Sequence, residues 1–294
     1  MRLDRFLLAR GELGTRSQIQ RLIREGHVHL ASQPVKAGTP LRAGQCVTVE
    51  RQPHAAPLLE AEAIDLSVLY EDDALMVINK PAGLVVHPAP GHWSGTLVNA
   101  LLHRWRGQTR GMDLARLGLV HRLDKDTSGV LIIAKDAATL AALGQGFRRR
   151  EVEKRYLALA WGRFRRPAGV IRAPIARHPV HRQRMAVRPG GREAVTRYEV
   201  VEQFDDVSFV RLSPETGRTH QIRVHLAATG HPIVADAHYA GRRRESALPI
   251  SRQALHAESI AFEHPTLRTL VRVSAPLPAD LIAALRALRS AQRV

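Results

Sequence analysis

The sequence has 294 residues, of which 44 are lysine or arginine and 27 are aspartate or glutamate, so its formal net charge at pH 7 is +17. This excess of positive charge favours a nucleic acid over a neutral metabolite as partner. A single cysteine, Cys46, excludes an intramolecular disulfide and a multi-cysteine zinc site, and we expect it to be a small apolar filler. The sequence has neither an evident signal peptide nor an apolar run long enough to span a bilayer, so we expect a cytoplasmic protein.

The first fifty residues predict a small unit of their own. An apolar pattern that begins at Leu3 has helical spacing, and Thr15 and Ser17 can cap a second helix that Gly26 ends. The alternating stretches HVHLA and CVTVE then predict a small sheet.

Arginines lie mainly on the polar side of the predicted helix pair: Arg5, Arg16, Arg21 and Arg24. They can serve solubility, but arginines and helix N-termini both suit phosphate, which favours contact with an RNA backbone. RLDRFL and TRSQIQRLIREG resemble the pattern of the S4 RNA-binding module. The resemblance implies RNA binding, and we assign contacts to Arg16, Arg21 and Arg24.

Composition divides the chain into two domains. Residues 51–65 contain two prolines and no clean period, as is typical of a linker. We therefore expect an N-terminal domain at 1–52, a linker at 53–65 and a large domain at 66–294.

The large domain is expected to be rich in β-strands. The apolar runs at 74–80 and 129–135 predict buried strands, and Asp136 can cap the helix that follows. Helices are also expected near 219–229 and at the C-terminus. Because the strands come in runs, we predict an α+β fold with a largely antiparallel mixed sheet flanked by helices. Five further strands are predicted by RYLALAW, TRYEVVEQ, SFVRLSP, SIAFEH and TLVRVS.

The stretch HRLDKDTSG, residues 121–129, places Asp124 among basic residues in a chain that should bind a polyanion. Such an acid is most often a turn residue or a surface ion pair. The DTSG turn signal, however, would present Asp124 on a loop at the start of a strand, where site residues often lie. A structural role and a pocket-edge role both remain open for Asp124, whereas Asp126 is expected to stabilise the turn.

A second candidate is TGRTHQIRVHLA, which carries Arg218, His220, Gln221 and Arg223 near a predicted helix start. This segment can be a basic helix face on phosphate, or one arginine can point inward and fix a buried carboxylate.

Tyr156 is a third candidate. It shares a strand face with Ala158 and Ala160, whose small side chains leave room around the ring. Core packing explains this pattern as well as stacking on a base does, with the hydroxyl then available for proton transfer.

Four motifs occur in the order VINKPAGLVVHP, HRLDKDTSGVLIIAK, EKRYLALAWG and TGRTHQIRVHLAATGHPIVAD. Together they resemble the RluA family of RNA pseudouridine synthases, in particular its large-subunit ribosomal RNA branch, which carries an N-terminal S4 module. The resemblance implies an S4-type α/β module followed by a pseudouridine synthase domain. It also implies an isomerase that needs no cofactor and no metal.

The same resemblance implies roles for individual residues. Asp124 matches the catalytic aspartate that acts at the ribose C1', and Arg223 matches the basic residue that pairs with it. Tyr156 matches the tyrosine that stacks on the uracil and serves in removing the C5 proton, and Arg122 can occupy the space left by the flipped base. Four further residues are assigned to the pocket or the RNA backbone: Lys80, Arg218, His220 and Gln221.

Two alternatives remain beside a ribosomal RNA synthase, namely a transfer-RNA synthase with the same chemistry and a noncatalytic RNA-binding assembly factor. A binding module gains nothing from an acid near phosphate, so Asp124 separates the last from the others. Ala235 replaces the family's usual glycine, which implies a turn with altered backbone angles. We expect a monomer.

Overall fold

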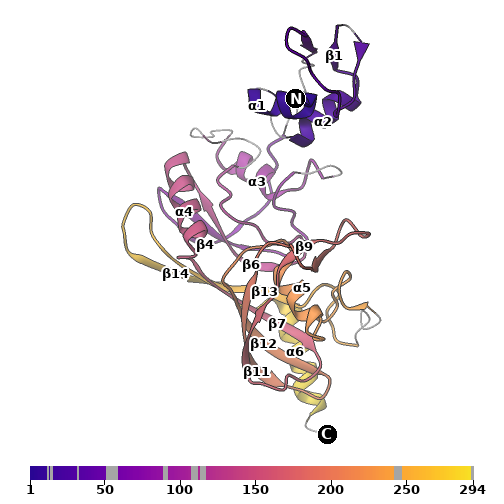
Figure 1. Cartoon of the computed structure of the whole chain (residues 1–294). Coiled ribbons are helices and arrows are strands. Elements are labelled where there is room, and N and C mark those ends of the chain that lie inside the picture. Colours follow the sequence, from indigo (N-terminus) through magenta and orange to yellow (C-terminus); the bar gives the residue numbers. More distant parts are fainter. Residues whose placement is uncertain are drawn as a thin grey trace. The chain divides into compact units, whose positions relative to one another are not determined.

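The structure is a computed structural model in which the chain forms two compact units, Met1–Leu58 and Leu59–Val294 (Figure 1). No helix among the described residues is long and apolar enough to cross a membrane. The residues that the structure describes are 1–11, 13, 16–31, 33–50, 59–88, 92–106, 112, 117–241 and 247–292.

The N-terminal unit contains the two predicted helices, α1 (Leu3–Arg10) and α2 (Arg16–Arg24). Gly26 follows α2 with φ +81°, a conformation that favours glycine, and so ends the helix as expected. Thr15 and the side chain of Ser17, the predicted caps, lie outside the described part. The described strands, which form an antiparallel sheet in the order β2-β1-β3, are β1 (Val28–Leu30), β2 (Gln33–Pro34) and β3 (Val47–Val49).

Apolar side chains from both helices and β1 form the core of this unit, among them Leu3, Ile19 and Val28, each with no exposed surface. Cys46 is exposed, so the expectation of a buried filler is wrong. It precedes β3 on the loop from β2, where little of the small core can cover it.

In the described part of the second unit, nine strands form a sheet in the order β4-β5-β6-β13-β7-β12-β11-β8, with β14 paired to β13. All pairings are antiparallel except that of β6 with β13, which confirms the predicted α+β fold with a largely antiparallel sheet. The strands are β4 (Ser67–Glu71), β5 (Leu75–Lys80), β6 (Ser128–Ala134), β7 (Glu153–Trp161), β8 (Ala168–Arg172), β11 (Val195–Gln203), β12 (Val207–Pro214), β13 (Leu255–Glu263) and β14 (Leu270–Ser274).

Helices cover both faces of the β5–β6 part of the sheet. Met76 and Leu131 pack with α3 (Leu97–Arg104), whereas Val77 and Val130 pack with α4 (Ala137–Arg149). Side chains alternate between the two faces of a strand, so a strand that is covered on both faces needs apolar residues at every position. This explains the continuous apolar runs of β5 and β6 in the sequence.

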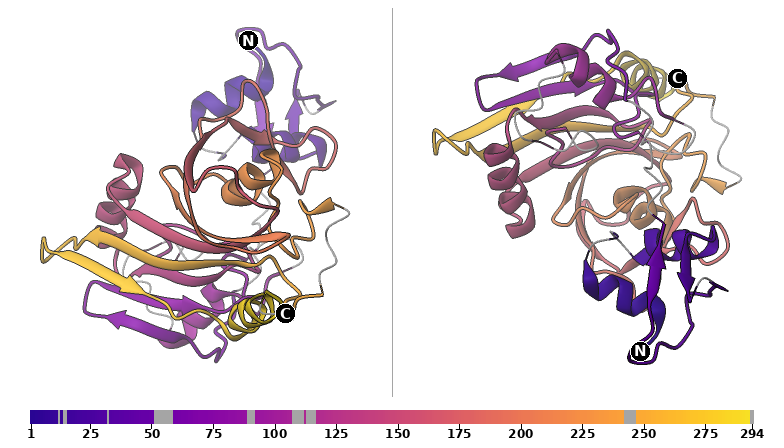
Figure 2. Two further views of the ribbon diagram at one scale, coloured as in Figure 1. Left: turned by 90° about the horizontal axis from the view of Figure 1, so that it is seen from below. Right: turned by 90° about the horizontal axis from the view of Figure 1, so that it is seen from above.

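The remaining helices, α5 (Gln221–Ala228) and α6 (Ala279–Ala291), pack against the other half of the sheet. Leu226 of α5 and Leu281 of α6 share one apolar cluster with residues of β7 and β12. Figure 2 shows α6 at the opposite end of the sheet from the β13–β14 hairpin. A two-stranded hairpin, β9 (Ile175–Arg177) with β10 (Met185–Val187), lies beside α5.

Residues 59–65, which composition assigns to the linker, pack against the second unit. Leu59 contacts the cluster around α3, and Asn99 of that helix donates to the carbonyl of Glu60. The rest of the predicted linker up to residue 58 lies outside the described residues.

Gly129 fixes the start of β6 close to β13. Its φ is +115°, and a Cβ here would collide with the carbonyl oxygen of Ala257. Glycine therefore permits the short parallel contact of β6 with β13, directly after the loop that carries Asp124.

Candidate active site

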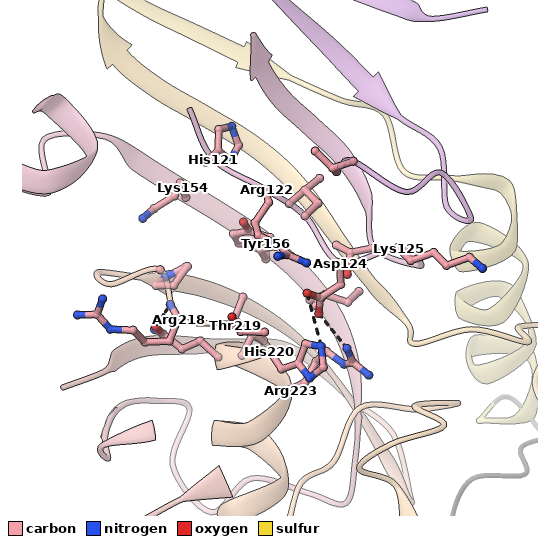
Figure 3. A pocket seen from close by; sticks show the side chains of 18 of the residues that line it. His121, Arg122, Asp124, Lys125, Lys154, Tyr156, Arg218, Thr219, His220 and Arg223 are labelled. Carbon is pink, nitrogen blue, oxygen red and sulfur yellow. Dashed lines mark hydrogen bonds and ion pairs between the residues drawn. The ribbon is translucent and has the colours of Figure 1, made fainter. Parts of the chain in front are cut away.

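A pocket of about 840 Å³ lies on the second unit beside β7, between the 119–127 loop and the segment 214–223 that leads into α5. Asp124, Tyr156 and Arg223, the three residues assigned to catalysis, all line it. Figure 3 shows their side chains meeting there from three separate segments. The sheet thus brings together residues that lie far apart in the sequence.

The loop that carries Asp124 is held on its inner side by hydrogen bonds to its backbone. Lys80 donates to the carbonyl of Lys125 at 2.9 Å, and Arg252 donates to that of Asp126 at 2.9 Å. The N–H of Thr127 closes a turn onto the carbonyl of Asp124 at 3.1 Å. These contacts fix the backbone and leave the Asp124 carboxylate, 18% exposed, directed at the pocket.

Arg223 connects this carboxylate to a second, fully buried one. Its Nη1 donates to Oδ2 of Asp124 at 2.9 Å, while Nε and Nη2 donate to the two oxygens of Asp236 at 2.7 and 2.9 Å. Burial disfavours the charge of Arg223, but Asp236 and then Asp124 outweigh this and raise the pKa of the guanidinium above its usual value. The sequence alone left open whether an arginine points inward, and Arg223 does.

Asp236 was not identified as a functional residue from the sequence. It has no exposed surface, and it also accepts the backbone N–H groups of His238 and Tyr239. Burial raises the pKa of Asp236, but the opposing effect of Arg223 and of these N–H groups is larger. The pKa of Asp236 therefore lies below its usual value. An acid in the PIVAD stretch was the available signal, but its partner is not visible locally.

The positive charge of Arg223 is shared unequally between Asp236 and Asp124. Asp236 makes the two-point pair with Arg223 and so balances its positive charge. Asp124 then receives a directed hydrogen bond while the three groups together keep one negative charge. A carboxylate held in this way can stabilise positive charge that develops close by.

Ala235, the replacement for the usual glycine, has φ +57°. The turn is therefore left-handed at a residue that carries a Cβ, a conformation that glycine adopts more readily. The Cβ makes this conformation costly, by about 1–2 kcal/mol.

Tyr156 lies on β7 at the floor of the pocket, next to Asp124 (Figure 3). Burial raises the pKa of its hydroxyl, and the charge of Asp124 adds to the effect. The phenol is therefore protonated at neutral pH and presents a flat, uncharged ring.

His220 faces the other oxygen of Asp124, with Nε2 at 3.9 Å from Oδ1. Its Nδ1 lies 2.7 Å from the hydroxyl of Tyr239, which accepts the N–H of Met185. Burial lowers the pKa of His220, so the ring is neutral, and the nearby carboxylate favours the tautomer with the proton on Nε2. His220 has φ +54°, a strained conformation of the kind found at functional sites.

The remaining residues assigned to RNA or substrate differ in their surroundings. Arg122 is exposed and points into the pocket beside Tyr156 (Figure 3). Arg218 lines the pocket, and its Nε donates to the carbonyl of Glu193 at 3.0 Å. Gln221 is buried and ties α5 to β11 through the carbonyl of Val195, so it shapes the pocket wall rather than offering a free amide to RNA.

Lys80 does not fit the direct RNA contact predicted for it. The side chain has no exposed surface and is not part of the pocket wall. Its ammonium donates to three carbonyl oxygens, those of Pro81, Leu84 and Lys125, at 2.7, 3.0 and 2.9 Å. Burial lowers the pKa of Lys80 to about 7. Lys80 thus fastens the Asp124 loop from within.

The arginines of the N-terminal unit also differ. Arg16 donates to the buried carboxylate of Asp4 at 2.9 Å, with about half of its side chain exposed. Nε of Arg21 lies 3.9 Å from the carboxylate of Glu25, which directly follows α2, and Arg24 is exposed. Arg16 therefore has a structural partner as well as an exposed guanidinium.

Sequence reasoning missed residues of the pocket wall as well as the buried Asp236. Lys154 lies two residues before Tyr156 on the same strand face, which the alternation of the strand could have revealed. His121 also lines the pocket and accepts the N–H of Ile132, and burial lowers its pKa to about 3, so it is neutral.

Comparison with known proteins identifies the family of the chain. Residues 74–228 match the RNA pseudouridylate synthase family, and residues 1–46 match the S4 domain. The chain is 41% identical to ribosomal large subunit pseudouridine synthase D of Nitrosomonas europaea over 99% of this chain and 85% of that one. It is 47% identical to an RNA pseudouridine synthase of Chloroflexus aurantiacus over 98% of this chain and 90% of that one.

A similar solved structure is that of human RNA pseudouridylate synthase domain containing 1. The TM-score is 0.60 at 29% identity, with 80% of this chain and 97% of that one covered. Family match, relatives and fold agree with the four motifs. The chain belongs to the RNA pseudouridine synthases and is an isomerase that converts uridine in RNA to pseudouridine.

Proposed function

We propose that this enzyme modifies uridines of large-subunit ribosomal RNA and that Asp124 acts at the ribose C1' of a flipped-out nucleotide. The RNA target is supported by the names of full-length relatives and by the S4 match. The observation that carries the role of Asp124 is its hydrogen bond from Arg223, whose own charge Asp236 balances.

The reaction needs a group that manages charge at C1'. The N1–C1' bond breaks with its electron pair on the uracil, the base turns, and C5 bonds to C1'. The C5 proton is removed and N1 takes up a proton, so atoms and electrons balance without a redox partner. Asp124 can stabilise positive charge at C1', attack it, or take the C2' proton. All three routes require that the carboxylate of Asp124 is held in place, and the hydrogen bond from Arg223 holds it.

We assign the flat ring of Tyr156 to stacking on the uracil. The ring is partly buried and uncharged, and its hydroxyl lies in the field of Asp124, where a proton from C5 can pass. Arg122 extends from the loop that carries Asp124 and is suited to fill the gap left by the flipped base. Flipping costs a few kcal/mol, which contacts from the pocket and from the S4 arginines can offset.

These contacts all come from one chain, so we propose a monomer, acting in the cytoplasm. A transfer-RNA target remains the second candidate, because the chemistry is the same. Mapping on both RNA classes decides between them.

The test is pseudouridine mapping by carbodiimide-dependent reverse-transcription stops on ribosomal and transfer RNA from a strain that lacks the protein, before and after incubation with the pure enzyme. We expect new stops at large-subunit uridines. Stops confined to transfer RNA would contradict the proposed ribosomal RNA target. The absence of stops on every RNA would contradict the proposed enzymatic activity.

Asp124→Asn tests the role of the acid. We expect turnover to fall by about 10³-fold or more, with RNA affinity retained. Asp126→Asn is the matched control, since Asp126 lies two residues away and is not part of the pocket wall. An equal loss in both variants would contradict the assignment.

A further inference from the structure

Lys154 is a partly buried cation in the pocket wall that the chemistry assigned above does not use. It lies on β7 two residues before Tyr156 and lines the same pocket. In Figure 3 its side chain lies on the opposite side of Tyr156 from Asp124, as does that of Arg218. The pocket therefore has two cations, Lys154 and Arg218, on the side away from Asp124, and we call this its basic side.

The surroundings of Lys154 differ from those of the other buried cations in this unit. Lys80 has three carbonyl partners, Arg223 has two carboxylates, and Arg252 pairs with Asp280. Among the described residues, no acid lies within ion-pair distance of the Lys154 ammonium and no acceptor hydrogen-bonds to it. The ammonium instead lies over the ring of Phe147, whose centroid is 5.8 Å away.

The position of the Lys154 ammonium costs the unliganded protein free energy, because the charge is partly removed from water. Burial lowers the pKa of Lys154, and the charge of Lys154 contributes to lowering that of His121. A bound anion would remove both penalties, because a cation taken out of water is stabilised mainly by an opposite charge.

Arg218 supplies a second cation on this side. Its Nε is fixed on the carbonyl of Glu193, so the guanidinium is held in orientation. Burial lowers its pKa, and repulsion from Arg192 and Arg150 adds to this. Two cations beside one cavity favour a phosphate over a neutral acceptor such as a uracil carbonyl.

We propose that Lys154, with Arg218 beside it, binds a backbone phosphate of the RNA next to the uridine that enters the pocket. The proposal rests on the proposed function in that the reacting ribose lies at Asp124. The phosphodiester chain then continues past Tyr156 to the basic side. Lys154 thereby fixes the direction in which the RNA strand crosses the pocket.

The first test is salt-dependent binding of Lys154→Met to a uridine-rich single-stranded oligonucleotide, which does not depend on which RNA is the natural target. Loss of one phosphate contact should lower the slope of log K against log salt by about 0.7 and weaken binding roughly tenfold at low salt. Lys154→Arg should keep the wild-type slope. Arg172→Met, which removes an exposed charge on β8 away from the pocket, is the control for net charge.

The second test changes the RNA instead of the protein. A stem-loop centred on a mapped uridine receives a single neutral methylphosphonate at each neighbouring linkage in turn. We expect one linkage to weaken wild-type binding roughly tenfold but to leave Lys154→Met unaffected, whereas Arg172→Met should show the full wild-type penalty.

The outcomes separate this proposal from the proposed function. An unchanged slope in a folded Lys154→Met protein would overturn the phosphate site even if ribosomal RNA is modified. The phosphate site is also overturned if turnover falls while the methylphosphonate penalty persists, because Lys154 would then contact the base. A lowered slope on the oligonucleotide supports the phosphate site even if mapping finds no ribosomal target.

Discussion

Arg223 and Asp236 hold each other by two hydrogen bonds of 2.7 and 2.9 Å, and the remaining guanidinium nitrogen of Arg223 is 2.9 Å from Asp124. The buried carboxylate therefore sets both the orientation and the charge balance of the arginine. Asp236 reaches Asp124 only through Arg223, so we expect it to act as a positioning residue.

Asp236→Asn should reduce turnover by about 10²-fold without weakening RNA binding. The charge of Arg223 would then fall on Asp124 alone, and the guanidinium would lose its fixed orientation. Removing the acid from this buried pair should also lower the free energy of unfolding by about 3 kcal/mol. Single-turnover kinetics and chemical unfolding measure the two effects, and a variant that is less stable but fully active would contradict the positioning role.

Tyr156→Phe separates the ring from its hydroxyl. We expect RNA affinity to stay near the wild-type value because stacking is retained, while turnover falls by about 10²–10⁴-fold if the hydroxyl passes the C5 proton. Tyr156→Leu should in addition weaken binding by about 1–3 kcal/mol. If the Phe variant were as active as the wild type, the hydroxyl would have no part in proton transfer and stacking would be the only role of Tyr156.

Arg252 couples the C-terminal helix to the loop that carries Asp124. It pairs with Asp280 at the start of α6 and donates to the carbonyl of Asp126 and to the hydroxyl of Ser128. Arg252→Met should misplace the loop and lower turnover by about 10²-fold at unchanged RNA affinity. Arg252→Lys, which keeps the charge but not the forked geometry, should recover little of this loss. Full activity in the Lys variant would show that charge alone suffices.

Ala235→Gly should stabilise the protein by about 1 kcal/mol, because glycine adopts φ near +57° without the strain caused by a Cβ. Turnover should be unchanged, since Asp236 keeps its place. Chemical unfolding compared with Ala240→Gly, a buried alanine without a positive φ, provides the control. A loss of stability at position 235 would contradict the strain argument.

Asp72 should contribute to the decrease in the free energy of unfolding at acidic pH. Burial raises its pKa, but hydrogen bonds from Tyr70, from the backbone of Leu75 and Ala74, and from His264 lower it from 3.8 to about 2. The folded state thus holds this proton less tightly than the unfolded state, so the stabilisation is present above pH 4 and is lost as the pH falls towards 2.

Asp72→Asn should remove that contribution. The variant should be less stable than the wild type at pH 7, and the difference should shrink between about pH 4 and pH 2. The neighbouring Asp73 is exposed, so Asp73→Asn is the control and should follow the wild-type curve. A constant difference between Asp72→Asn and the wild type down to pH 2 would contradict the assignment.

Much of the fold could be predicted from local patterns. The apolar runs of β5 and β6 are buried as expected, and Asp136 caps α4 by accepting the N–H of Thr139 at 2.8 Å. The strands β4, β8, β9 and β10 were not predicted, because each has five residues or fewer and so too short a stretch to show a clear alternation.

The site was predictable in its parts but not in its connections. The motifs placed Asp124 and Arg223 in one site, and the structure joins them across 99 positions of sequence. The partner of Arg223, the burial of Lys80 and the missing partner of Lys154 among the described residues depend on the packing of separate segments. No pattern of neighbouring residues encodes such packing.

The hydroxyl oxygen of Tyr239 joins three segments, since it takes the N–H of Met185 from β10, faces Nδ1 of His220, and belongs to the turn that carries Asp236. A displaced hairpin would remove the Met185 hydrogen bond and leave the phenol with His220 as its remaining printed partner among the described residues. The β9–β10 hairpin therefore supports the His220 ring from outside the pocket wall, through one phenol.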